Sequence, residues 1–155
     1  MINTNKYVIY TDGACKGNPG RGASAYVILD ALENNIIKSD SIYYPKCTNN
    51  YAELMAVYKA LEFVNKKLLN ENLDIIIKSD SKYCVDGCST WMYNWNKKGT
   101  LSSRVNGDIW KELFILIQII KNKIHKIEFI LIKGHSGIEW NEYCDTLVNK
   151  IISEN

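Results

Sequence analysis

The chain has 155 residues, of which 46% are hydrophobic and 23% charged, and its net charge at pH 7 is +2. This composition is typical of a globular protein, and we expect one domain over residues 1–155. A strongly basic tail is excluded, and so is a membrane span, because the longest apolar run, Leu113 to Ile117, is far too short. The five cysteines are scattered and no secretion signal is visible, so we expect an intracellular protein, cytoplasmic or nuclear.

The first third of the chain has the pattern of short strands separated by turns. We predict strands over Lys6–Thr11, Ala23–Leu29 and Ile36–Tyr44, joined as an antiparallel meander. The spacing of the apolar residues then becomes helical, from Asn50 to the pair Lys66 and Lys67.

The rest of the chain alternates strands with helices. Leu73–Ile77 is almost wholly apolar, which predicts a strand buried on both faces. The other predicted elements are short helical stretches over Tyr83–Asp86 and Trp91–Trp95, a loop over Lys97–Ser103, a helix over Gly107–Ile120, a strand over Lys126–Ile132 and a helix over Asn141–Ile152. This order predicts an α/β fold: a five-stranded mixed sheet, with three antiparallel strands followed by parallel strands, flanked by helices.

Asp12 is the only acid between Met1 and Leu29, and it directly follows the first strand. One interpretation is that Asp12-Gly13 forms a hairpin turn, which is a common use of this dipeptide. The other is that a carboxylate at the end of a buried strand binds a ligand.

Two further acids have the same two kinds of interpretation. Glu53 lies on the apolar face of its predicted helix, although it could instead form a capping box with Asn50. Asp80 follows a buried strand, at the edge where open α/β sheets bind ligands, although it could instead cap a helix that begins near Lys82.

Asp145 completes the set, on the same side of the last helix as the apolar residues Val148 and Ile152. Its alternative is a solvated surface acid. Four acids on different elements of one sheet repel one another unless cations are bound, and such oxygen ligands suit Mg²⁺ or Mn²⁺. Two such ions about 3.5–4 Å apart serve phosphodiester cleavage.

Four segments together resemble type 1 ribonuclease H, and they span nearly the whole chain in the family's order. They are Tyr10-Thr11-Asp12-Gly13-x-Cys15-x-Gly17-Asn18-Pro19-Gly20, Thr48-Asn49-Asn50-x-x-Glu53-Leu54-Met55-Ala56, Asp80-Ser81-x-Tyr83-x-Val85 and Lys133-Gly134-His135-Ser136-Gly137-x-x-x-Asn141-Glu142-x-Cys144-Asp145. The resemblance implies a ribonuclease H-like fold. It also implies endonucleolytic hydrolysis of the RNA strand of RNA/DNA hybrids, with two Mg²⁺ ions, for which Mn²⁺ can substitute, leaving 5′-phosphate and 3′-hydroxyl ends.

The resemblance assigns a role to each acid and to one histidine. Asp12 would bridge both metals, Asp145 would complete the site of the ion that activates water, and Glu53 and Asp80 would hold the ion at the leaving 3′ oxygen. His135 would assist proton transfer or release of the product phosphate. Its alternative is a flexible surface histidine, although the flanking glycines are typical of a mobile loop over a site.

The same resemblance implies substrate contacts. Recognition of RNA requires neutral groups near the 2′-hydroxyls. The implied contacts with the RNA strand are Cys15, Asn18, Asn49 and Asn50, those with a phosphate of the DNA strand are Lys46, Thr48 and Asn106, and those of a basic protrusion on that strand are Trp91, Lys97 and Lys98. The asparagines are also common turn and cap residues, and at least one of Trp91 and Trp95 would pack in the core.

The sequence departs from the family in this protrusion. Thr100 replaces a usual aromatic residue, Arg104 is the only further cation, and Lys46 stands where arginine is frequent. We therefore expect weak hybrid binding with a shallow salt dependence.

Two other hypotheses remain at this point: a noncatalytic hybrid-binding domain, and a nuclease domain released from a reverse transcriptase. The first would be expected to have lost a carboxylate, and this chain has all four. The closeness of Met1 to the first strand favours a free-standing protein over the second. The few residues before Lys6 and after Ile152 leave no room for an additional hybrid-binding domain, and we expect a monomer without an obligate protein partner.

Overall fold

The computed structural model describes residues 5–155, and its elements follow the predicted order. Residues 1–4 lie outside this range, and so does that part of the N-terminus for which the sequence predicts no secretion signal. The strands are β1 (Lys6–Lys16), β2 (Gly20–Asp30), β3 (Ile36–Cys47), β4 (Asp74–Ser79) and β5 (Lys126–Leu131). The helices are α1 (Asn49–Lys67), α2 (Lys82–Asp86), α3 (Met92–Lys97), α4 (Gly107–Lys121) and α5 (Glu139–Ser153), with a π-helical turn η1 (Gly87–Trp91) and a 3₁₀ turn η2 (Leu101–Ser103).

The five strands form one mixed sheet in the order β3-β2-β1-β4-β5. β1 pairs antiparallel with β2, and β2 pairs antiparallel with β3, which confirms the predicted meander. β4 runs parallel to β1, and β5 runs parallel to β4. The central strand is therefore β1, and Thr11 pairs with Ser79, so that Asp12 within β1 lies next to the end of β4, where Asp80 follows directly.

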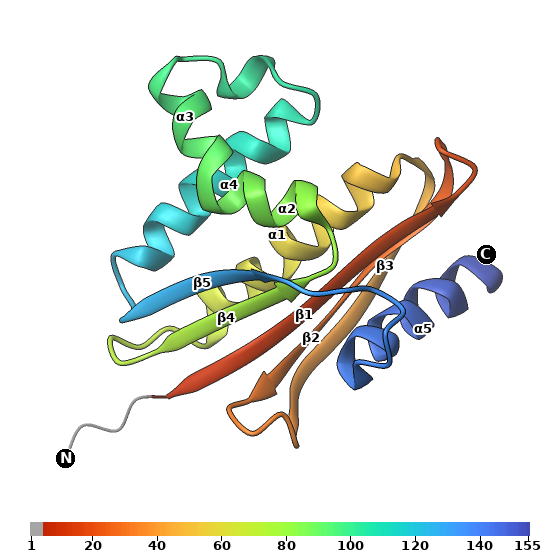
Figure 1. Cartoon of the computed structure of the whole chain (residues 1–155), viewed down its shortest axis with the longest axis horizontal. Coiled ribbons are helices and arrows are strands. Elements are labelled where there is room, and N and C mark those ends of the chain that lie inside the picture. Colours follow the sequence, from red (N-terminus) through yellow and green to blue (C-terminus); the bar gives the residue numbers. More distant parts are fainter. Residues whose placement is uncertain (1–4) are drawn as a thin grey trace.

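Helices cover the two faces of the sheet unequally (Figure 1). On one face α1 and α4 pack on the sheet around Leu61, Ile77 and Trp110, all fully buried. On the other face α5 packs against β1 and β2 through Cys144, Val148 and other apolar residues. These two layers hold the central strand between them.

The unequal cover corrects one prediction about β4. Ile75 and Ile77 are fully buried, as expected, but Ile76 on the opposite face is only half-buried. Because α5 lies against the first three strands, it leaves this face of β4 without a helix.

No helix of residues 5–155 is long and apolar enough to cross a bilayer.

The first hairpin is longer than the apolar pattern indicated. The hairpin-turn interpretation of Asp12-Gly13 is wrong, because both residues lie within β1, where they pair with Ala25 and Ser24. The turn comes at residues 17–19, where Gly17 adopts a φ of 75° that favours glycine. The backbone ladder thus continues well beyond the apolar run over residues 7–10.

Candidate active site

Strand β1 and helix α1 meet at a backbone-to-backbone contact. A Cβ atom at Gly13 would overlap the backbone of Ala52 and Glu53, so only glycine permits this approach. Ser24 on β2 adds a hydrogen bond, in which its hydroxyl donates to the Ala52 carbonyl at 2.5 Å. The first turns of α1 are thereby fixed beside Asp12.

Three of the predicted acids lie together at this contact. Asp12, Glu53 and Asp80 each offer an oxygen, and these oxygens all lie within 4.8 Å of one another. The two capping alternatives are wrong, because Thr48 caps α1 by accepting from the Tyr51 N–H and Ser81 caps α2 in the same way. The carboxylates of Glu53 and Asp80 are therefore aimed at Asp12 and not at helix ends.

Asp145 lies beside this cluster, within a second group. His135, Glu142 and Asp145 offer ligand atoms that also lie within 4.8 Å of one another. Asp145 is half-buried, so it is not the solvated surface acid of the alternative interpretation. The sequence prediction gives Glu142 no role, although its position one helical turn before Asp145 indicates that the two side chains share a face of the helix.

The loop before α5 brings His135 to the site. A Cβ atom at Gly134 would overlap the Asp80 carboxylate, so the loop backbone lies directly against that group. His135 has a φ of 52° and Gly137 a φ of 84°, both in the left-handed region. This turn presents the exposed imidazole beside Asp145 and Glu142.

The buried carboxylates repel one another, and their proton affinities show it. Burial, followed by the charges of Asp80 and Asp145, raises the pKa of Asp12 to about 7. Burial and the Asp12 and Asp80 charges raise the pKa of Glu53 well above its usual range, and burial raises the pKa of Asp80. Burial and mutual repulsion thus act in the same direction on all three carboxyls, whose pKa values lie above their ordinary values.

This environment fits a divalent cation. The Oε1 atom of Glu53 is buried and has no hydrogen-bond partner within residues 5–155, although such atoms are usually paired. A hard cation would pair that oxygen and neutralise the neighbouring charges, and carboxylate oxygens are the ligands that such cations prefer. The donor set therefore matches a metal site.

Cys15, Asn18 and Asn49, three of the residues predicted to contact RNA, form one hydrogen-bonded group. The Cys15 N–H donates to the Asn49 side-chain oxygen at 3.0 Å, and the Asn49 N–H donates to the Asn18 side-chain oxygen at 3.1 Å. The group joins the turn of the first hairpin to the start of α1. Asn50 and Lys46 are exposed on either side of Asn49 and Thr48.

A hollow of about 530 Å³ begins at Asn50 and runs toward residues 103–105. Its lining includes Tyr83, Trp95, Arg104 and Trp110. The predicted phosphate contacts Thr48 and Asn106 are not among its lining residues: Thr48 precedes α1, and Asn106, with a left-handed φ of 61°, follows the lining residue Val105 and precedes α4.

The predicted basic protrusion is divided between two surfaces. Trp95 packs edge-on against the buried Trp110, and the Arg104 guanidinium lies 4.8 Å above its ring, so Trp95 is the tryptophan with a packing role. Trp91 is 37% exposed, and Lys97 and Lys98 are fully at the surface. These three residues do not line the hollow described above.

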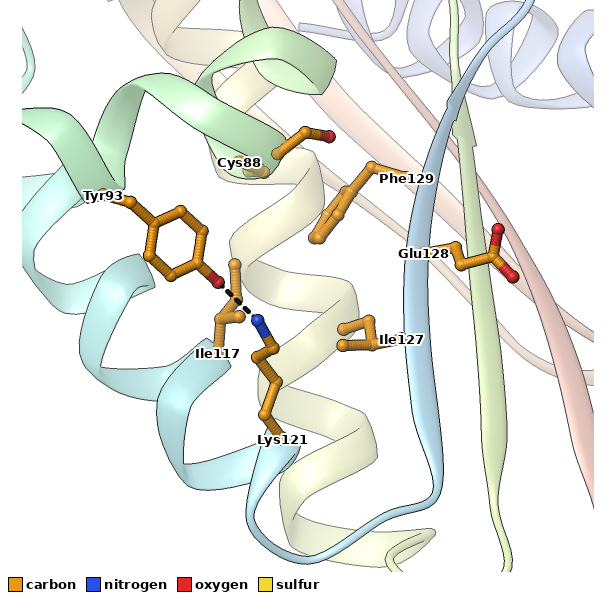
Figure 2. A pocket seen from close by; sticks show the side chains of 8 residues that line it. Cys88, Tyr93, Ile117, Lys121, Ile127, Glu128 and Phe129 are labelled. Carbon is orange, nitrogen blue, oxygen red and sulfur yellow. Dashed lines mark hydrogen bonds between the residues drawn. The ribbon is translucent and has the colours of Figure 1, made fainter.

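A separate hollow of about 280 Å³ lies between α4 and β5 (Figure 2). Tyr93 and Lys121 border it and are joined by a hydrogen bond of 2.8 Å, and Ile117, Ile127 and Phe129 form its apolar wall. None of the four acids lines it. It is therefore not a candidate for the chemistry of the carboxylate cluster.

Comparison with known proteins gives concordant matches. A family model described as RNase H matches residues 4–153. The ribonuclease H of Alcanivorax borkumensis is 40% identical over 152 residues, covering 95% of this chain and 91% of the relative. The ribonuclease H of Prosthecochloris aestuarii is 39% identical over 155 residues, covering 97% of each.

Solved structures agree with these relatives. LC11-RNase H1 in complex with an RNA/DNA hybrid is 30% identical, with a TM-score of 0.67 and coverage of 96% of this chain and 97% of that one. LC9-RNase H1, a type 1 enzyme with the type 2 active-site motif, is 25% identical, with a TM-score of 0.80 and coverage of 99% and 75%. The ribonuclease H-like sheet order and flanking helices are thereby confirmed.

Proposed function

The chain belongs to the ribonuclease H family, whose members are metal-dependent nucleases, and from this premise we propose its reaction and the residues that perform it. The proposed reaction is endonucleolytic hydrolysis of the RNA strand of an RNA/DNA hybrid, leaving 5′-phosphate and 3′-hydroxyl ends. The observation that carries the proposal is the convergence of Asp12, Glu53 and Asp80 from three elements, with Asp145 beside them.

In this proposal the acids hold two Mg²⁺ ions, for which Mn²⁺ can substitute. Asp12 would be shared by both ions, Asp145 would help to hold the ion that supplies the attacking water, and Glu53 with Asp80 would hold the ion near the leaving 3′ oxygen. Bound ions would activate the attacking water and neutralise charge at the leaving 3′ oxygen. The carboxylates are ionised in that state, because a cation removes the repulsion that raises their pKa values.

His135 is proposed to move protons at the edge of the site. Its imidazole shares a cluster with Glu142 and Asp145 and lies on a loop that packs on Asp80. A histidine in this place can accept a proton from water or assist departure of the product phosphate at neutral pH.

Substrate recognition is assigned to the surface on either side of the first turn of α1. Cys15, Asn18, Asn49 and Asn50 would contact the 2′-hydroxyls of the RNA strand, since neutral donors and acceptors read this group. The proposed contacts with the DNA strand are Lys46, Thr48 and Asn106 at a phosphate, and Trp91, Lys97 and Lys98 on the outer surface. We assign the activity to a monomer with one domain, acting inside the cell on nucleic acid.

The proposal is tested with labelled substrates of five kinds: hybrid, duplex RNA, duplex DNA and each single strand, in Mg²⁺ with and without a chelator. We expect cleavage of the hybrid alone, abolished by the chelator, with products whose 3′ ends a polymerase can extend. Binding of the hybrid without any product would instead support a noncatalytic domain. Cleavage that persists in chelator would overturn the metal assignment.

A further inference from the structure

The turn between β2 and β3 contains a strained residue. Glu33 adopts a left-handed φ of 57°. Asn106 and His135 share this conformation, but they are of the types that tolerate it, whereas glutamate is not. Asp30 holds the turn, because its carboxylate accepts from the Asn34 N–H at 2.9 Å and from the Asn35 side-chain amide at 2.7 Å. Such strain persists only where the surrounding contacts maintain it, and it is frequent near functional sites.

Glu33 contacts three different elements. Its Oε1 atom accepts a hydrogen bond from the Tyr10 hydroxyl at 2.6 Å, and its Oε2 atom lies 3.8 Å from the Lys78 ammonium. Its backbone carbonyl accepts from the Trp140 indole N–H at 3.0 Å. Lys78 also donates to the Tyr10 hydroxyl at 3.5 Å, which closes the network.

Each contacted element carries one of the acids. Tyr10 lies two residues before Asp12 on β1, so the two side chains share a face of the strand. Lys78 lies near the end of β4, two residues before Asp80, which directly follows this strand. Trp140 lies in the first turn of α5, and Asp145 lies farther along the same helix.

The first turn of α5 is held by apolar packing, in which Ile138 and Trp140 lie against the core of this face, and by few polar contacts. Farther along the helix, the Tyr143 hydroxyl hydrogen-bonds Ser39 at 3.1 Å, and Arg21 donates to the Asn155 carbonyl near the C-terminal end. Within the described part of the chain, no side chain caps the N-terminus of α5. The Trp140–Glu33 hydrogen bond is therefore the polar tie nearest the His135 loop.

We propose that Glu33 is a positioning residue, which holds β1, β4 and α5 in the relative placement that brings Asp12, Asp80 and Asp145 together. This inference rests on the proposed function of those acids. Glu33 touches neither substrate nor metal. It acts through Tyr10, Lys78 and Trp140, so its loss should weaken metal binding and turnover while leaving the hybrid-binding surface intact.

The test uses Glu33→Ala, which removes both side-chain contacts, and Trp140→Phe, which removes the indole donor while keeping an aromatic ring. Glu33→Gln keeps an acceptor for Tyr10 and should restore much of the function. Glu128→Ala is the matched control, because Glu128 is also a partly exposed glutamate paired with a lysine, at 2.8 Å from Lys126.

Two measurements are made on each variant: Mg²⁺ binding to the substrate-free protein by calorimetry, and initial rates on labelled hybrid against Mg²⁺ and hybrid concentration. Groups behind metal ligands typically change affinity by about 10–100-fold, and this network lies one step farther away. We therefore expect Mg²⁺ affinity to fall about three- to tenfold in Glu33→Ala and Trp140→Phe, with a matching fall in kcat. KM for the hybrid should stay within about twofold, since the network makes no phosphate contact.

Unchanged Mg²⁺ affinity and kcat in both variants would overturn the inference, and a lower urea midpoint of unfolding in the same variants would then show that the turn serves stability alone. An equal effect in Glu128→Ala would overturn it as well. Failure of the proposed function is distinguishable, because the wild-type protein would then show no Mg²⁺-dependent cleavage of hybrid.

Discussion

The carboxylate site and the segment over residues 91–106 are built in opposite ways, although both are proposed to act on one substrate. The acids stand on the central strands and on two long helices, and Asp12 is only 7% exposed. The segment consists mainly of a six-residue helix, a 3₁₀ turn and loops, with Lys97 and Lys98 in solvent and Val105 84% exposed.

The difference reflects what each task requires. Metal chemistry depends on the relative positions of several carboxylates within fractions of an ångström, which only packed elements can hold. Contacts with a phosphate backbone tolerate long, mobile side chains, because the attraction is electrostatic and carries no sequence information. Mutations at the carboxylates should therefore change kcat, whereas mutations in the segment should change the affinity for the hybrid.

The largest expected effect comes from Asp12→Asn. The amide keeps the shape of the side chain but removes the charge shared by both proposed metal sites, so kcat should fall roughly a thousandfold or more. Binding of hybrid, measured by fluorescence anisotropy, should change by less than about twofold, because Asp12 lies outside the proposed phosphate contacts. Retained turnover in single-turnover assays would contradict the division between the two regions.

The same substitution should stabilise the protein when metal is removed. The pKa of Asp12 rises from 3.8 to about 7 on folding, so the folded state binds more protons across this window and stability falls as pH rises through it. In chelator at about pH 8, the free energy of unfolding of Asp12→Asn should exceed that of the wild type by about 1–2 kcal/mol, since even one pKa unit corresponds to about 1.4 kcal/mol. The urea midpoint of unfolding should be higher accordingly. At about pH 4 the difference should nearly vanish, and a constant difference across pH would refute the electrostatic cause.

The smallest effect is expected in the exposed segment. Replacing Lys97 and Lys98 by alanine should raise KM about threefold without changing kcat, and should reduce the salt slope of binding by about 0.9 for each phosphate that is no longer neutralised. The matched control replaces Lys66 and Lys67 at the far end of α1, which should change neither value. A fall in kcat in the Lys97 and Lys98 variant would show that the segment also positions the chemistry.

Much of the fold could be read from the sequence, because its signals are local. Strand and helix order, the antiparallel meander and the four acids follow from apolar spacing and from motifs around Asp12, Glu53, Asp80 and Asp145. The predicted first strand is too short, since backbone pairing with β2 continues past the apolar run over residues 7–10 to Lys16.

The remaining features depend on contacts between distant residues. Glu33 and Trp140 are 107 positions apart, and no local sequence pattern predicts that the Glu33 carbonyl accepts a hydrogen bond from the Trp140 indole. The exposed face of β4 is similar, because its cover depends on where α5 lies across the sheet. The position of Glu142 near the site, in contrast, could be predicted from the sequence, since helical spacing places it beside Asp145.

The contact at Gly13 also limits which sequences this site can accept. Any side chain there would push α1 away from β1, whatever its charge or polarity. In a library of all single substitutions selected for cleavage, position 13 should therefore be as intolerant as position 12, although Gly13 has no group that could take part in the reaction. Position 12 would then tolerate no substitution because of its chemistry, and position 13 because two peptide backbones pass too close together for any side chain.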